Sequence, residues 1–284
     1  MPLKLSDITE NVTKVPALPQ IVITLLELLQ DPETSASQIE ELIQKEPGLA
    51  AQVLKLVNSA FYAMPTPIGD IKRAVTILGF REIKNIVVAN SISKAFKGLR
   101  FSKSFNMTTF WRHSLVNACV TRFMAENSKK KVEGDAFTLG LLHDIGKLIL
   151  AAYAPEAMEE IIKIATAKEI SFYDAEALHM STNHTEIGAW LSEKWKMPPS
   201  LTDSIRNHHN PEHFEKNVLT ASAHFGNYIA SVKKMRCDGS IERMPLNNTV
   251  WNILGLQRDA LRNVLESVNK EIQAAEAMVS CLES

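Results

Sequence analysis

The sequence predicts an all-α protein, a multi-helix bundle with a helical subdomain at its N-terminal end. Three observations support this prediction. Apolar residues recur at the three- and four-residue spacing of helices through most of the 284 residues. No segment shows sustained alternation of apolar and polar residues, and no Asn-Gly or Asp-Gly pair lies between strand-like segments. Prolines stand at the edges of the periodic segments, where they start or end helices.

The first third of the chain is expected to be a set of short helices. Ser37 and Glu40 have the spacing of a capping box, in which two side chains satisfy free backbone amides at the start of a helix. Pro47 is expected to start the following helix, and Gly79 to end another, because glycine favours the conformation that closes a helix. The predicted helices cover residues 20–30, 37–45, 48–61, 71–78 and 82–96.

The remaining two thirds are expected to be longer helices separated by proline-containing loops. These helices cover residues 105–125, 135–152, a segment that starts at Pro155, 171–178, 185–195, 200–208, 218–235 and 256–282, with a polar loop over 237–245. We expect one unit over residues 1–284, made of an N-terminal helical subdomain (12–104), a helical core (105–236) and a C-terminal loop with a long helix (237–284).

Composition and charge bound the functional classes. The net charge of -1 supplies no overall basic field, and the lysine-rich segments 129–131 and 233–236 are expected to be solvated, so a nucleic-acid partner is not expected. The N-terminal residues contain no apolar signal core, and no apolar run approaches the roughly 20 residues that cross a bilayer. Three widely separated cysteines fit a reducing compartment. These features predict a cytoplasmic protein with no membrane partner.

The chemistry of the chain gathers around His143 and Asp144. These two residues stand between the apolar runs 136–142 and 145–152, and the pattern predicts a largely buried helix. Burying a carboxylate costs several kcal/mol unless a charge, a hydrogen bond or a metal compensates it. The sequence therefore raises the question of which group compensates the charge of Asp144.

Histidines supply one answer. Of the eight in the chain, five lie in or beside apolar helices, at positions 113, 143, 184, 208 and 224. A single buried histidine is usually a hydrogen-bonded core residue, and a purely structural role for all of them stays open. Several histidines with a neighbouring carboxylate favour a metal site, because helices commonly carry such ligands inward.

Several motifs resemble a known family. Trp111-Arg112-His113-Ser114 and Leu141-Leu142-His143-Asp144-Ile145-Gly146-Lys147 resemble the HD superfamily of metal-dependent phosphohydrolases. Over residues 12–235 the chain is similar to the HDOD domain, through Pro16-Ala17-Leu18-Pro19, Leu56-Val57-Asn58-Ser59-Ala60-Phe61-Tyr62, Ala74-Val75-Thr76-Ile77-Leu78-Gly79, Asn183-His184-Thr185-Glu186-Ile187-Gly188-Ala189, Trp195-Lys196-Met197-Pro198 and His208-His209. The resemblance implies an HD-like helical bundle.

The resemblance also implies a set of metal ligands, for one or two divalent ions such as Fe, Mn, Zn or Ni. These are His113, His143, Asp144 and Asn227 for one ion, and His184, His208 and His209 for a second, with Lys147 beside them. Asn227 stands where HD enzymes have an aspartate, and an amide oxygen brings no negative charge. Metal affinity and the acidity of bound water should fall. His224 lies three residues earlier on the same face and could replace the missing ligand, with Asp238 a further alternative.

Two functions follow from the resemblance. The favoured one is a regulatory module that acts in signal transduction by binding a protein partner and retains a degenerate HD metal site. The alternative is a metal-dependent phosphohydrolase or phosphodiesterase for a nucleotide or cyclic nucleotide, with Asp144 and Lys147 as catalytic residues; a nucleotide ligand stays open. The Gly-Tyr-Pro segment of HD-GYP phosphodiesterases is missing, since His208-His209-Asn210-Pro211 continues directly into Glu212. That absence disfavours cyclic-di-GMP hydrolysis.

Overall fold

The computed structural model describes residues 3–12, 16–29, 31, 33–59, 62, 64–128, 135–210, 217–232, 246, 248–255, 266–270, 272–273, 275–276 and 279. Regular structure within these residues is helical, apart from an isolated bridge between Leu3 and Met180. The all-α prediction is confirmed. Several predicted features lie outside the described residues: the lysine-rich segments 129–131 and 233–236, Glu212, Asp238, the 237–245 loop and the first part of the 256–282 helix.

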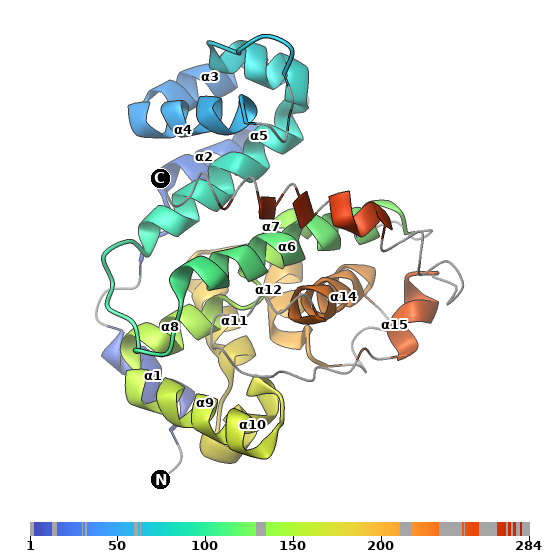
Figure 1. Ribbon diagram of the computed structural model, residues 1–284. Coiled ribbons are helices and arrows are strands. Elements are labelled where there is room, and N and C mark those ends of the chain that lie inside the picture. Colours follow the sequence, from blue (N-terminus) through green and yellow to red (C-terminus); the bar gives the residue numbers. More distant parts are fainter. Residues whose placement is uncertain are drawn as a thin grey trace. The chain divides into compact units, whose positions relative to one another are not determined.

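The chain forms two compact units (Figure 1). The small unit spans Pro16–Gly98 and Gln273–Ser284, and the large unit spans Met1–Val15 and Leu99–Ile272. Helices of the small unit are α2 (Gln20–Leu28), α3 (Ala36–Gln44), α4 (Pro47–Val57) and α5 (Ile71–Ala95). Those of the large unit are α1 (Leu5–Asn11), α6 (Met107–Glu126), α7 (Ala136–Leu142), α8 (Ile145–Tyr153), α9 (Pro155–Lys168), α10 (Phe172–His179), α11 (His184–Lys194), α12 (Pro199–Asn207), α14 (Val218–Val232) and α15 (Asn248–Ile253).

Helix boundaries in the small unit test the local predictions. Gly79 has φ +80° and ψ 161°, which interrupts α5 between the two predicted helices. The predicted capping box at Ser37 is wrong by two residues. Ser35 caps α3 instead: its Oγ accepts from the amide of Gln38, whose side chain accepts from the amide of Ser35 at 2.8 Å. Both serines precede a Glu or Gln by three residues, so the pattern alone could not choose between them.

The single helix predicted over residues 135–152 is also wrong, because the chain breaks at His143 and Asp144. Helix α7 ends at Leu142, and α8 begins at Ile145 with Asp144 at its N-cap. The His143 ring bonds back to the Gly140 carbonyl at 2.8 Å, which holds the turn. By length and composition Ala136–Tyr153 is the one stretch among the described residues that could cross a membrane, yet 83% of it is buried inside the structure.

Close helix crossings in the large unit position the broken segment. Helix α6 lies beside α7 and α14, and α11 beside α8 and α12 (Figure 1). At Gly146 a Cβ atom would lie 1.9 Å from the carbonyl oxygen of His184, so only glycine lets α8 approach the start of α11 this closely. The crossing brings His184 next to Asp144.

Candidate metal centre

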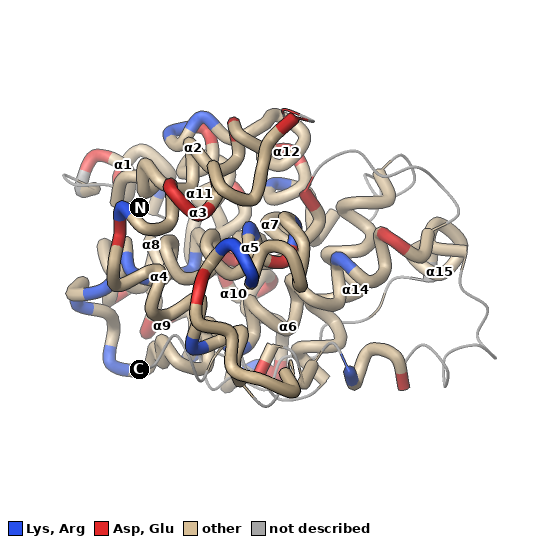
Figure 2. The backbone as a smooth tube through the Cα atoms, turned by 90° about the horizontal axis from the view of Figure 1, so that it is seen from above, with Lys and Arg blue, Asp and Glu red and all other residues tan. Residues whose placement is uncertain are grey.

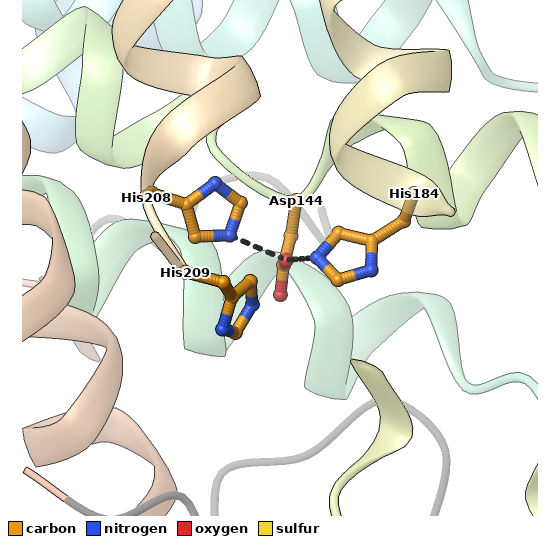
Figure 3. Close-up of side chains that lie close together, drawn as sticks. All are labelled: Asp144, His184, His208 and His209. Carbon is orange, nitrogen blue, oxygen red and sulfur yellow. Dashed lines mark ion pairs between the residues drawn. The ribbon is translucent and has the colours of Figure 1, made fainter. Parts of the chain in front are cut away.

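Five helices deliver the predicted ligands to one place. His113 comes from α6, His143 and Asp144 from the break between α7 and α8, His184 from the first position of α11, and His208 and His209 from the end of α12. Figure 3 shows the last three histidines around Asp144. All of these side chains are buried except His209, which is partly exposed.

One oxygen of Asp144 faces the α6 side of the centre. Its Oδ2 lies 3.4 Å from Nε2 of His113, 3.3 Å from Nε2 of His143 and 2.8 Å from Nζ of Lys147. The two Nε2 atoms are 3.2 Å apart. Lys147 is itself buried and lies over the ring of Phe172, 5.1 Å from its centroid. His113, His143 and Asp144 therefore form one group of converging ligand atoms.

The other oxygen of Asp144 faces α11 and α12. Its Oδ1 lies 3.2 Å from Nε2 of His184 and 3.6 Å from Nε2 of His208 (Figure 3). Together with His209 these residues form a second group, in which the ligand atoms lie within 4.8 Å of one another. Asp144 belongs to both groups, so its carboxylate is placed between two possible ion positions.

In this second group, hydrogen bonds form at the outward ring nitrogens and not at the atoms that face inward. Nδ1 of His208 bonds the Ile205 carbonyl at 2.7 Å, and Nδ1 of His184 bonds Glu176 at 2.6 Å. Nε2 of His184, His208 and His209, and Oδ1 of Asp144, have no hydrogen-bond partner and are buried. In a metal-binding histidine, the outward ring nitrogen is hydrogen-bonded and the inward ring nitrogen is left for the ion. These residues fit a divalent ion.

Burial and charge set the protonation of the doublet. Burial lowers the pKa of His143 to about 4, which keeps the ring neutral near pH 7 despite the neighbouring carboxylate. Burial would raise the pKa of Asp144, but His143 and Lys147 outweigh it and hold that pKa well below its usual range. A neutral imidazole and an ionised carboxylate are the forms that bind metal.

Glu176 completes the centre, and sequence reasoning missed it. Its fully buried carboxylate accepts from the backbone amide of His184 at 2.8 Å as well as from the ring. Burial lowers the pKa of His184, but the Glu176 carboxylate outweighs it and the pKa rises to about 9. An acidic residue eight positions before a ligand was the only available signal, and its burial arises from tertiary packing. Tyr173, one turn earlier, stacks on His209 with ring centroids 4.7 Å apart.

Asn227 and His224 lie on α14, and His224 belongs to neither of the two groups of converging ligand atoms. Asn227 is 1% exposed, and neither its Oδ1 nor its Nδ2 has a hydrogen-bond partner. No hydrogen bond or ion pair joins Asn227 to Asp144 in the described part of the chain. His224 does not converge with the ligand atoms; its Nδ1 lies 2.9 Å from the carbonyl oxygen of His208. His224 thus contacts the backbone of a ligand.

Comparison with known proteins agrees with the geometry. The HDOD domain model matches residues 15–211. An HDOD domain protein of unknown function from Geobacter sulfurreducens superposes with a TM-score of 0.83, at 22% identity and 96% coverage of both chains. A "Putative phosphohydrolase" from Shewanella amazonensis SB2B gives 0.72, at 25% identity and 97% coverage of both chains.

An uncharacterized protein of Treponema pallidum is 25% identical over 222 residues, which are 76% of this chain and 42% of that protein. The chain therefore spans less than half the length of this curated relative. The matched family model, in contrast, covers well over half of the chain and includes the ligands from His113 to His209. The chain belongs to the HDOD family.

Proposed function

We propose that this protein is a regulatory HDOD module that binds one or two divalent ions in the large unit and acts in signal transduction through a protein partner. The observation that carries the proposal is the burial of the centre, in which only His209 among the converging ligands is partly exposed. His113, His143, Asp144, Lys147, His184 and His208 are each at most 3% exposed. Burial limits the access of a substrate, and a catalytic metal site must keep one coordination position open to water or substrate, whereas a structural site does not.

The ligand set supports this reading. Five imidazoles and one carboxylate suit Fe, Mn, Zn or Ni better than the oxygen-binding ions Mg and Ca. Asn227, as an amide, adds no negative charge, so an ion would be less fully neutralised than in a centre with two carboxylates. Lys147 already neutralises part of the charge of Asp144 at 2.8 Å. The imidazoles favour retention of a transition-metal ion, whereas the amide and the pairing of Asp144 with Lys147 lower its affinity.

Charge and location complete the proposal. Lys and Arg positions are interspersed with Asp and Glu positions along the described helices (Figure 2), a pattern that does not favour nucleic acid as the partner. We propose that the protein is cytoplasmic and has no membrane partner.

The test combines metal analysis with an activity assay. The full chain, purified both with and without oxygen, should contain about one or two ions of Fe, Mn, Zn or Ni per molecule. An Asp144→Asn variant should lose them, whereas Glu160→Gln, an exposed carboxylate of the same unit, should not. Hydrolysis of bis(p-nitrophenyl)phosphate and of cyclic nucleotides should stay at background with Mn or Fe added. Turnover on the order of 1 per second or faster would contradict a regulatory module.

The second candidate is a metal-dependent phosphohydrolase. The ammonium group of Lys147, held beside a carboxylate shared by two groups of ligands, favours it. A divalent ion bound here would supply Lewis acidity and a water of lowered pKa. Asp144 and the histidines would hold and orient the site, and Lys147 would offset negative charge on a phosphate. If this candidate is right, Lys147→Met should abolish hydrolysis and leave the metal content unchanged.

A further inference from the structure

A surface at the kink of α5 combines exposed apolar side chains with positive charge. Ile77 is 47% exposed and Phe80 37% exposed, on either side of Gly79. They are three positions apart in the chain, so their Cα atoms are within roughly 11 Å of each other. Among the described residues only Leu178 and Val232 are comparably exposed large apolar side chains, and they lie on separate helices. Among the described residues, the kink is thus the one place where two exposed large apolar side chains lie close together in the sequence.

Positively charged side chains lie near this pair in the sequence, at positions where positive charge does not stabilise the helix. Lys72 and Arg73 are exposed in the first turn of α5, which contains no acidic residue. The amide end of a helix is positive, so cations there oppose helix formation. Asp70, the sole acidic residue between 64 and 81, serves as the N-cap and accepts from the amide of Arg73 at 2.7 Å. Nη2 of Arg73 donates to Oγ1 of Thr66 at 3.4 Å, whereas the helix dipole gives no local reason for either cation.

Hydrogen bonds hold the described part of the loop that leads into α5. Asn58 holds the loop before α5 by two hydrogen bonds to Ile68: its Nδ2 donates to the carbonyl at 2.8 Å, and its Oδ1 accepts from the amide at 2.7 Å. Pro65 and Pro67 restrict the backbone of the same loop. A surface that is rigid before binding loses little conformational entropy when a partner covers it.

We propose that this kink surface, made of Lys72, Arg73, Ile77, Phe80 and Arg81, binds an acidic protein segment that carries apolar side chains. Carboxylates of the partner would meet the cations, and its apolar side chains would cover Ile77 and Phe80. An aliphatic side chain offers nucleic acid little, which favours a protein partner. The inference rests on the proposed function, in which the module acts through a protein, and it assigns the chemistry of that protein.

The probe is a fluorescein-labelled peptide of Leu, Phe, Asp and Glu with helical spacing, titrated with the full chain and followed by anisotropy. Ile77→Ser and Phe80→Ser should each weaken binding at least about five-fold. The double variant Lys72→Glu/Arg73→Glu should do the same, and added salt should mimic it. Because Glu is favourable in the first turn of a helix, lost binding in this variant cannot arise from a weakened α5.

Matched controls make the same chemical changes in the large unit. Leu178→Ser removes an exposed apolar side chain and Lys168→Glu reverses an exposed charge, and both should bind the peptide as the unmodified protein does. Equal binding by the kink variants overturns the inference. So does preference for phosphatidylserine vesicles, for an RNA or DNA oligomer, or for a peptide with Lys in place of its acids.

Metal content, measured on the same samples, separates the two proposals. If the protein holds its full metal content but does not bind the acidic peptide, the kink-surface proposal is wrong and the metal-binding proposal stands. Missing metal or rapid phosphodiester hydrolysis contradicts the proposed function, whatever the peptide does.

Discussion

Asp144 is a fully buried carboxylate, and its neighbours decide what the centre can do. Lys147 and His184 lie on opposite oxygens, at 2.8 and 3.2 Å. Because the pKa of His184 is about 9, the metal-free centre keeps a proton on this ring, between Glu176 and Asp144. A divalent ion would replace that proton at Nε2 and leave the bond to Glu176 in place. Metal and proton thus compete for the same nitrogen.

Glu176 orients His184, so its substitution should weaken metal binding without unfolding the protein. The Glu176→Gln variant should bind Zn or Mn about 10- to 100-fold more weakly in a chelator competition, as is typical when a partner of a ligating histidine is lost. Glu160→Gln is the matched control, since Glu160 pairs with Lys163 on the surface. Unchanged affinity in Glu176→Gln would show that the bond at 2.6 Å does not position the ligand.

The histidine pKa values predict how stability varies with pH in the chelated protein. The pKa of His184 is raised from 6.5 to about 9, so its contribution is complete below pH 6.5 and is lost as the pH rises towards 9. Burial lowers the pKa of His143 and of His224 to about 4, so their contributions are complete above pH 6.5 and are lost as the pH falls towards 4. Urea unfolding should therefore give maximal stability near pH 6.5. If His184→Gln keeps the full decline between pH 6.5 and 9, the assignment to His184 is wrong.

At the scale of helices, the contact between α8 and α11 fixes the site. Gly146→Ala would place a Cβ 1.9 Å from the carbonyl oxygen of His184, and backbone cannot move aside as a side chain can. We expect a loss of about 1–3 kcal/mol in the free energy of unfolding, with weaker metal binding. Gly48→Ala in α4 is the control: its nearest contact is 3.8 Å away, so its stability should be unchanged or slightly higher. If Gly146→Ala and Gly48→Ala changed the free energy of unfolding equally, the contact between α8 and α11 would not be a tight one.

Element boundaries show which features of the fold could be predicted. Gly79 was found because glycine itself signals a break. The break at His143 and Asp144 was missed because no glycine or proline stands there; the ring bond to Gly140 and the packing of α8 create it. The prediction that the histidines form two inward-facing groups came from the family motifs. Glu176 was missed because only tertiary burial distinguishes it from a solvated helix carboxylate.

At the scale of the molecule, the two proposed functions fall in different compact units: the candidate metal ligands belong to the large unit and the kink surface to the small one. An ion that binds only the folded large unit stabilises that unit by mass action. Chelation should therefore speed amide hydrogen exchange in α8 and α11 and leave α3 and α4 of the small unit unchanged. Uniform acceleration in both units would contradict an ion confined to the large one.

The most direct test of the centre is a crystal structure of the full chain with the ion identified by anomalous scattering. We predict an anomalous peak between Asp144 and the Nε2 atoms of His184 and His208, with the His184 ring still bonded to Glu176. A second peak beside His113 and His143 would fit a site with two ions. A map with no anomalous peak at either group, from crystals grown with excess Zn or Mn, would contradict the metal centre and leave the histidines as core residues.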